Sequence, residues 1–176
     1  MPDARAEFTA VYRQHLAAVS AYLARRVERE AVEDLAADVF AIAWRKRASV
    51  TAGEELPWLY RIASYQVANH RRRHTMRARA LALFTAPDAA PAADTVFDGD
   101  PQLAQTWRML TGSHREVLAL VVLDGLAVAE AAVALGVTPN AASIRLHRAK
   151  KACAAALAEV ESDAASARER SAAPAT

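Results

Sequence analysis

The segment from residue 126 to residue 149, LAVAEAAVALGVTPNAASIRLHRA, most constrains the fold, because its pattern is typical of two short helices joined by a tight turn. Apolar residues recur at helical spacing up to Leu135, and Gly136 follows at a position where a left-handed residue ends a helix. Thr138 can cap the next helix through its hydroxyl, and Pro139 occupies the first turn, where its missing N–H has no cost. The pattern predicts a helix-turn-helix.

The second helix of this pair has two chemically different faces. An inward stripe is predicted from Ala142, Leu146, Ala149 and Cys153. The opposite face is mostly polar and basic and consists of Asn140, Ser143, Ile144, His147, Arg148 and Lys151. Such a face suits the major groove of DNA, where side chains read the edges of the bases. An ordinary helical hairpin with a solvated basic face has the same pattern, so this segment alone leaves both interpretations open.

Composition favours helices and limits where nucleic acid could bind. Hydrophobic residues make up 53% of the 176 residues but aromatic residues only 6%, which disfavours a β-sandwich. The net charge of +2 is too small to attract nucleic acid to the whole molecule, so any binding surface must be local. The single cysteine excludes an internal disulfide and a multi-cysteine zinc site. Without a signal peptide or a bilayer-length apolar run, we expect a soluble, cytoplasmic protein with no membrane insertion.

We expect an all-α fold with two small helical domains joined by a flexible linker. Residues 1–84 form the first domain, with helices predicted from Phe8 to Val27, from about Ala31 to Arg47, and from Glu55 toward Arg79. Residues 85–101 contain three prolines and four aspartates but no basic residue, which predicts a tether.

The second domain is predicted over residues 102–161. Its four helices are expected at Gln102–Leu110, His114–Asp124, Val128–Leu135 and from Pro139 to about Val160. Ser113 and Glu116 have the spacing of a capping box at the start of the second of these. The tail 162–176 lacks large apolar residues and is expected to be disordered.

Aromatic and arginine side chains are interleaved along residues 57–79. Arginines neutralise phosphates, and an aromatic face stacks on an unpaired base with about 1–3 kcal/mol. That mixture suits DNA that is opened or held single-stranded, although an aromatic core and a solvated basic helix end would explain the segment by itself. A duplex-reading helix elsewhere in the chain shifts the balance toward DNA. The candidate residues are Trp58, Tyr60, Arg61, Tyr65, Asn69, Arg71, Arg72 and Arg73.

The helix predicted from Ala31 to Arg47 carries an acidic face of Glu33, Asp34 and Asp38, with Phe40 following them. Acidic side chains contact DNA unfavourably, so a functional role for this face requires a protein partner with a basic surface. A solvated surface is the simpler explanation of three exposed carboxylates taken alone.

Five segments in a fixed order resemble the extracytoplasmic-function sigma factors of bacterial RNA polymerase. The segments are FTAVYRQHLAAVSAYLARRV, VEDLAADVFAIAWRK, PWLYRIA followed by NHRRR, HREVLALVVLDGL, and AEAAVALGVTPNAASIRLHRAKK. Each is a weak signal alone, but all five in order across residues 8 to 157 make a strong one. The resemblance implies that the first domain is sigma region two and that the second is sigma region four.

The resemblance also implies roles and partners for the candidate residues. Glu33, Asp34, Asp38 and Phe40 are expected to bind core polymerase at the clamp coiled coil of its largest subunit, and region four to meet the flap of the second-largest subunit. The third helix is expected to open and read the minus-ten promoter element. Reading of the minus-thirty-five element is expected from Asn140, Ser143, Ile144, Arg145, His147, Arg148 and Lys151. An anti-sigma factor is a further expected partner.

The chain departs from the family pattern at several of these positions. Ser64 and Tyr65 stand where the family usually has an asparagine after Ile-Ala-Arg, and Asn69 stands where it usually has aspartate. The recognition helix lacks the usual Thr and Lys near Ala141 and Ala142, and Ala127 cannot cap the preceding helix. These changes leave the fold prediction intact and bear on promoter sequence.

The sequence predicts a promoter-specificity subunit that is not an enzyme and needs no cofactor, metal or small-molecule substrate. The five histidines are scattered, and no carboxylate partner or glycine-rich phosphate loop accompanies them. Two alternatives from other classes stay open. One is a helix-turn-helix regulator that acts without core polymerase, and the other is a degenerate sigma-like adaptor that only binds proteins.

Overall fold

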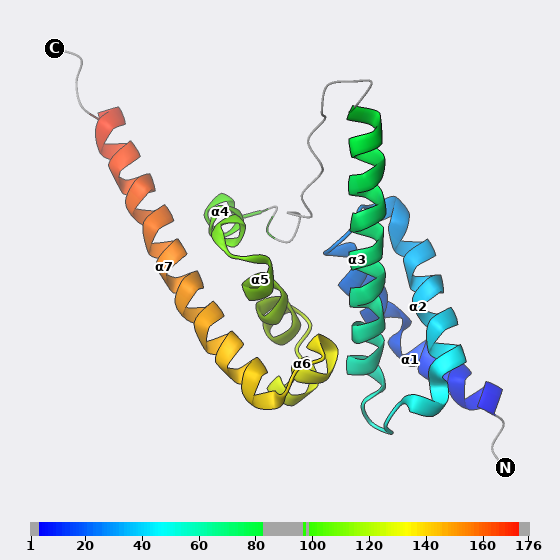
Figure 1. Ribbon diagram of the computed structural model, residues 1–176. Coiled ribbons are helices and arrows are strands. Elements are labelled where there is room, and N and C mark those ends of the chain that lie inside the picture. Colours follow the sequence, from blue (N-terminus) through cyan, green and yellow to red (C-terminus); the bar gives the residue numbers. More distant parts are fainter. Residues whose placement is uncertain (1–3, 83–96, 98, 173–176) are drawn as a thin grey trace. The chain divides into compact units, whose positions relative to one another are not determined.

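A computed structural model of the chain describes residues 4–82, 97 and 99–172 (Figure 1). All regular elements in these ranges are helical, which confirms the all-α prediction. The chain divides into two compact units, one of residues 1–93 with 132–136 and the other of residues 94–131 with 137–176. The part of the linker prediction from 85 to 96 falls outside the described residues.

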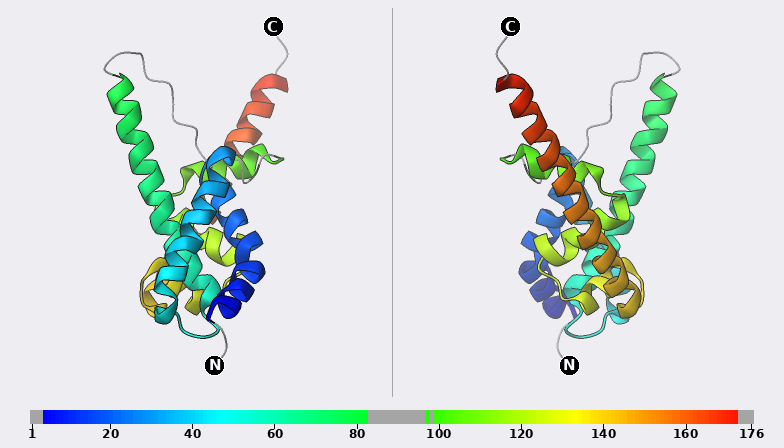
Figure 2. Two further views of the ribbon diagram at one scale, coloured as in Figure 1. Left: turned by 90° about the vertical axis from the view of Figure 1, so that its right-hand side faces the viewer. Right: turned by 90° about the vertical axis from the view of Figure 1, so that its left-hand side faces the viewer.

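Three long helices form the first unit: α1 (Ala4–Ala24), α2 (Val32–Lys46) and α3 (Glu55–Ala82). Each packs against the other two, and the C-terminal part of α3 continues past its neighbours (Figures 1 and 2). Single 3-10 turns, η1 (Arg29–Ala31) and η2 (Arg47–Ser49), flank α2. The core is aliphatic with three aromatic contacts, Phe8–Trp44, Tyr12–Phe40 and Tyr22–Tyr60, whose ring centroids lie 4.7 to 5.2 Å apart.

Asp100, a residue of the predicted linker, caps the first helix of the second unit. The Asp100 carboxylate caps α4 (Pro101–Met109) by accepting hydrogen bonds from the N–H groups of Gln102 and Leu103 at 2.9 and 3.0 Å. The ring of Phe97 contacts that of Trp107, with centroids 5.3 Å apart. The last residues of the predicted linker are therefore anchored to the second unit.

The predicted helix from His114 to Asp124 is present as two pieces, α5 (Gly112–Leu118) and the π-helical turn η4 (Ala119–Leu123). The predicted capping box was wrong, because Thr111 is the cap: its Oγ1 accepts from the His114 N–H at 3.3 Å, and Ser113 lies inside the helix. The Asp124 N–H bonds to the Ala119 carbonyl at 2.9 Å, which closes the wider turn.

Two further helices follow along the chain, α6 (Val128–Leu135) and α7 (Pro139–Ala172). The helix α7 packs against α4 and α5 and then continues as one rod (Figure 1). The prediction of a disordered tail was therefore wrong for residues 162–172, which are helical; alanines suit a helix even without a large apolar stripe. The rest of that tail lies outside the described residues.

Replacing Gly125 with alanine should lower the free energy of unfolding by about 1–2 kcal/mol, the cost of placing a Cβ in the left-handed region. Gly125 ends η4 with a φ of +72°, and no atom lies within 4 Å of the added Cβ, so backbone strain is the whole effect. Gly112→Ala is the matched control, because its φ is not left-handed and its surroundings are equally open. Equal urea midpoints for both variants would contradict this account.

Candidate nucleic-acid interface

The first turns of α7 present a continuous exposed face. Ala142, Leu146 and Ala149 are buried, as predicted, and Ile144 is 46% exposed. Successive residues turn by about 100° around a helix, which places the six outward residues within an arc of about 140°. All six are exposed: Asn140, Ser143, Ile144, His147, Arg148 and Lys151. Arg145 lies about 60° beyond this arc and is half-buried, and its contact with DNA stays a prediction.

The turn before α7 fixes where this face begins. Gly136 has a φ of +67°, as its predicted role as a helix stop requires. Thr138 caps α7 as predicted, with Oγ1 accepting from the Ala141 N–H at 3.2 Å. At the start of α6, the Glu130 carboxylate accepts from the Ala127 N–H at 2.7 Å, which supplies one half of a capping box although Ala127 has no capping side chain.

Charge changes sign along α7. From Pro139 to Ala158 the only charged side chains are basic or histidine: Arg145, His147, Arg148, Lys150 and Lys151. The exposed acids Glu159, Glu161 and Asp163 follow. This basic part of α7 therefore ends at Lys151, about two turns before the first of these acids.

A second face runs along α3. Trp58, Arg61, Tyr65, Asn69 and Arg72 recur every three or four residues, so they fall within an arc of about 80°. Tyr65 is 59% exposed, and the Asn69 carbonyl oxygen accepts a hydrogen bond from Arg72. Sequence reasoning missed Met76, which lies one turn beyond Arg72 and is 72% exposed. Met76 follows Arg72 by four residues, and this helical spacing could have placed it on the same face.

The structure corrects the prediction for Tyr60. Only 2% of this side chain is exposed, and its ring stacks on Tyr22 with centroids 4.7 Å apart. Its hydroxyl points to the Ala18 carbonyl at 3.5 Å. Burial raises the pKa of Tyr60, against a smaller opposite effect of Arg25 and Arg26. Tyr60 is a core residue and cannot stack on a base without leaving the bundle.

The three consecutive arginines of α3, Arg71, Arg72 and Arg73, differ in their contacts with the rest of the first unit. Arg71 donates from Nη2 to the Arg26 carbonyl at 3.1 Å, so it faces the end of α1. The neighbouring His70 places Nε2 2.7 Å from Oε1 of Glu28. Arg72 and Arg73 are exposed on other sides of α3. Arg71 is exposed as well, but its guanidinium group bonds to the backbone of the first unit, and its contact with DNA stays a prediction.

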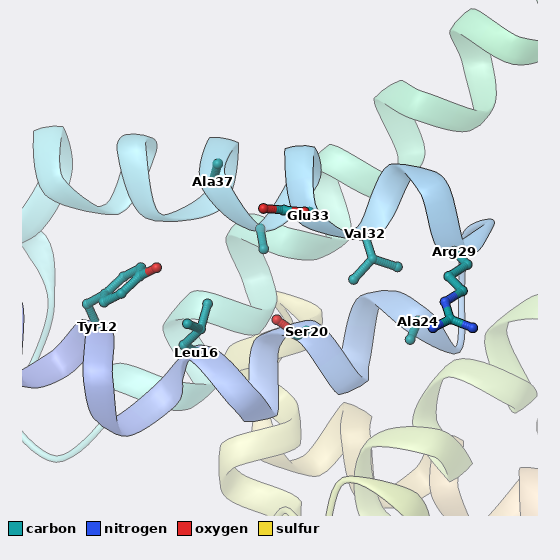
Figure 3. Close-up of a pocket in the computed structure, with 9 residues that line it drawn as sticks. Tyr12, Leu16, Ser20, Ala24, Arg29, Val32, Glu33 and Ala37 are labelled. Atoms are coloured by element: carbon teal, nitrogen blue, oxygen red, sulfur yellow. The ribbon is translucent and has the colours of Figure 1, made fainter.

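On α2 the three predicted acids Glu33, Asp34 and Asp38 are exposed together. Phe40 is only 4% exposed and packs edge-on against Tyr12, so its predicted contact with a partner was wrong. Beside the acids, a groove of about 510 Å³ runs between α1 and α2 (Figure 3). Its lining includes Tyr12, Leu16 and Glu33, and no sequence pattern indicated it.

Within the described ranges no group of three potential ligands is placed to hold a metal ion. None of the helices in the same ranges is long and apolar enough to cross a membrane.

Comparisons with known proteins identify both units. Residues 11–77 match the family described as Sigma-70 region 2, and residues 102–153 match Sigma-70, region 4. The RNA polymerase sigma factor CarQ of Myxococcus xanthus is 31% identical over 160 residues, covering 88% of this chain and 91% of that protein. The ECF RNA polymerase sigma factor SigF of Caulobacter vibrioides is 33% identical over 158 residues, covering 83% and 85%. The chain is an extracytoplasmic-function sigma factor.

Two solved structures share the fold of this chain. RpoE of Bartonella quintana, in complex with the anti-sigma factor NepR, has a TM-score of 0.63 at 21% identity and covers 86% of this chain and 96% of its own. CnrH, in complex with the cytosolic domain of CnrY, has a TM-score of 0.61 at 24% identity and covers 90% and 91%. The two faces described above thus belong to sigma regions 2 and 4.

Proposed function

We propose that this sigma factor brings core RNA polymerase to promoters through two separate DNA faces, one on each unit. The observation that carries the proposal is the pairing of an exposed duplex-reading face on α7 with an exposed aromatic and arginine face on α3. Each contact alone is small. Because both are tethered to the polymerase, the second is made at high effective concentration, and two weak contacts add to a strong one.

Region 4 reads the upstream, minus-thirty-five element in the major groove. Asn140, His147 and Arg148 offer donors and acceptors to base edges, and Ile144 can contact a thymine methyl group. Lys151 closes the basic part of the helix and suits a phosphate.

Region 2 captures the melted minus-ten strand. Tyr65 and Trp58 supply stacking surfaces, and Arg61 and Arg72 lie between and beyond them to neutralise phosphates. Asn69, held by Arg72, presents an amide to a base edge. Met76 extends the same face by one turn.

The acidic face of α2 docks on the clamp coiled coil of the largest polymerase subunit. Its carboxylates Glu33, Asp34 and Asp38 complement a basic surface, and the adjacent groove between α1 and α2 can accept an apolar side chain from the partner. Region 4 meets the flap of the second-largest subunit.

We infer the remaining features from the family. The protein acts in the cytoplasm, where polymerase and chromosome are, and works by binding rather than by catalysis, with no cofactor. An anti-sigma factor restrains it, as the name of the NepR complex suggests for a related protein.

Run-off transcription with purified core polymerase tests the proposal against its two alternatives. Promoter-dependent RNA from mapped start sites is the expected result. Promoter binding by the chain without core polymerase would indicate an independent regulator. Core binding without transcripts on any template from the source genome would indicate an adaptor.

A further inference from the structure

Two adjacent residues of α3 fasten it to the segment that leaves α1. His70 reaches Glu28 at 2.7 Å, and Arg71 reaches the Arg26 carbonyl at 3.1 Å. Arg26 itself donates to the Tyr22 carbonyl at 3.0 Å and lies over the Tyr22 ring, 3.6 Å from its centroid. A continuous set of contacts therefore joins the middle of α3 to the buried end of α1.

The position of Arg71 around α3 supports this separation from DNA. Relative to the centre of the face formed by Trp58, Tyr65 and Asn69, Arg72 lies about 40° away, Arg73 about 60° and Arg71 about 140°. A strand held on that face is within reach of the first two guanidinium groups. The third is turned toward Arg26.

We propose that His70 and Arg71 are positioning residues that clasp α3 to residues 26–28, and that within the triplet only Arg72 and Arg73 contact promoter DNA. The proposal rests on the promoter-binding function above and divides its arginines into two roles. The clasp sits at the level of the reading face, because Asn69 and Arg72 flank it in sequence. It fixes the part of α3 that presents those side chains.

The electrostatics of the clasp are favourable. Burial by itself raises the pKa of Glu28, but the bond from its own backbone, the bond from His70 and the charges of His70 and His74 together lower it. The His74 ring lies one turn along, with its centroid 6.4 Å from that of His70. A lowered carboxyl pKa means that this stabilisation is complete above the ordinary glutamate pKa of about 4.3 and is lost as the pH falls through the folded-state value. The Glu28 side chain is therefore ionised at neutral pH.

The salt dependence of DNA binding distinguishes a clasp from a phosphate contact. Holoenzyme binding to a fluorescent fork-junction promoter is measured from low to moderate salt, because the slope of log K against log salt counts neutralised phosphates. Arg73→Ala should reduce the slope by about 0.7 to 0.9, the value for one phosphate. Arg71→Ala should weaken binding several-fold at every salt concentration and leave the slope unchanged. A slope reduced as much as in Arg73→Ala would overturn the proposal.

Thermal unfolding of the full chain provides a second, DNA-free measurement. Glu28→Ala and His70→Ala should each lower the Tm. The double variant should have a Tm no lower than that of the less stable single variant, because each substitution removes the same contact. Arg73→Ala is the control and should leave the Tm unchanged. Additive losses would count against the clasp. If the wild-type holoenzyme does not bind promoter DNA, the proposed function is contradicted instead. The unfolding measurements do not involve DNA, so they would still test the clasp.

Discussion

Replacing Asp34 and Asp38 together with lysine is expected to weaken binding to core polymerase by about 100-fold or more. Paired charges at the centre of an interface each contribute roughly 2 kcal/mol or more, and about 1.4 kcal/mol corresponds to a tenfold change in affinity. Reversal of charge adds repulsion from the basic partner to the loss of attraction. Both side chains are exposed on α2, so the bundle should fold normally. Competition with a labelled sigma factor for core enzyme measures the change.

The matched control reverses two acids that lie far along the chain. Glu161→Lys with Asp163→Lys makes the same change in net charge on exposed positions of α7. This control should bind core polymerase within about threefold of wild type. Equal affinity of both double variants would show that α2 is not the docking surface.

Tyr60 and Tyr65 are expected to respond in opposite ways to truncation. Tyr60→Ala should lower the free energy of unfolding by about 3–5 kcal/mol, the cost of deleting a buried aromatic ring that here stacks on Tyr22. Tyr65→Ala should change stability by no more than about 0.5 kcal/mol, because its ring is exposed. It should weaken capture of the unwound strand by about 1–3 kcal/mol, the value of one stacked base.

Chemical denaturation of the chain and binding of single-stranded minus-ten oligonucleotide to holoenzyme measure the two effects. Tyr60→Phe keeps the stacked ring and loses only the long bond to Ala18, so it should stay near wild-type stability. If Tyr65→Ala binds the oligonucleotide as well as wild type does, α3 does not stack on DNA through this residue.

Local chemistry accounts for most of the fold that the sequence predicted. Gly125 and Gly136 ended their helices with positive φ, and Thr138 capped α7, because these features depend on a few neighbouring residues. The wrong prediction of the cap of α5 was also a local one, but two residues near that helix start could each act as the cap. Thr111 and Ser113 are both capping residues, and only the backbone conformation selects the first.

The candidate site was harder to predict because it depends on which side of a helix is covered. Tyr60 and Tyr65 look alike in sequence, yet packing against Tyr22 buries the first. Arg71 bonds to the carbonyl of Arg26, which is 45 residues away along the chain, and no local pattern indicates that contact. The groove between α1 and α2 is lined by residues of both helices, and the sequence of neither helix alone indicates it. The six outward residues of α7, in contrast, followed from periodicity alone because one apolar stripe defines that helix.

The helix α7 is continuous from the exposed residue Asn140 in its first turn to the buried residue Val160. At a rise of about 1.5 Å per residue these two positions lie about 30 Å apart along one helix. Because Ala142, Leu146 and Ala149 are buried on the other side of the first turns, any shift in their packing moves the outward face with it. Promoter preference in such a protein can be retuned by repacking residues that never touch a nucleotide.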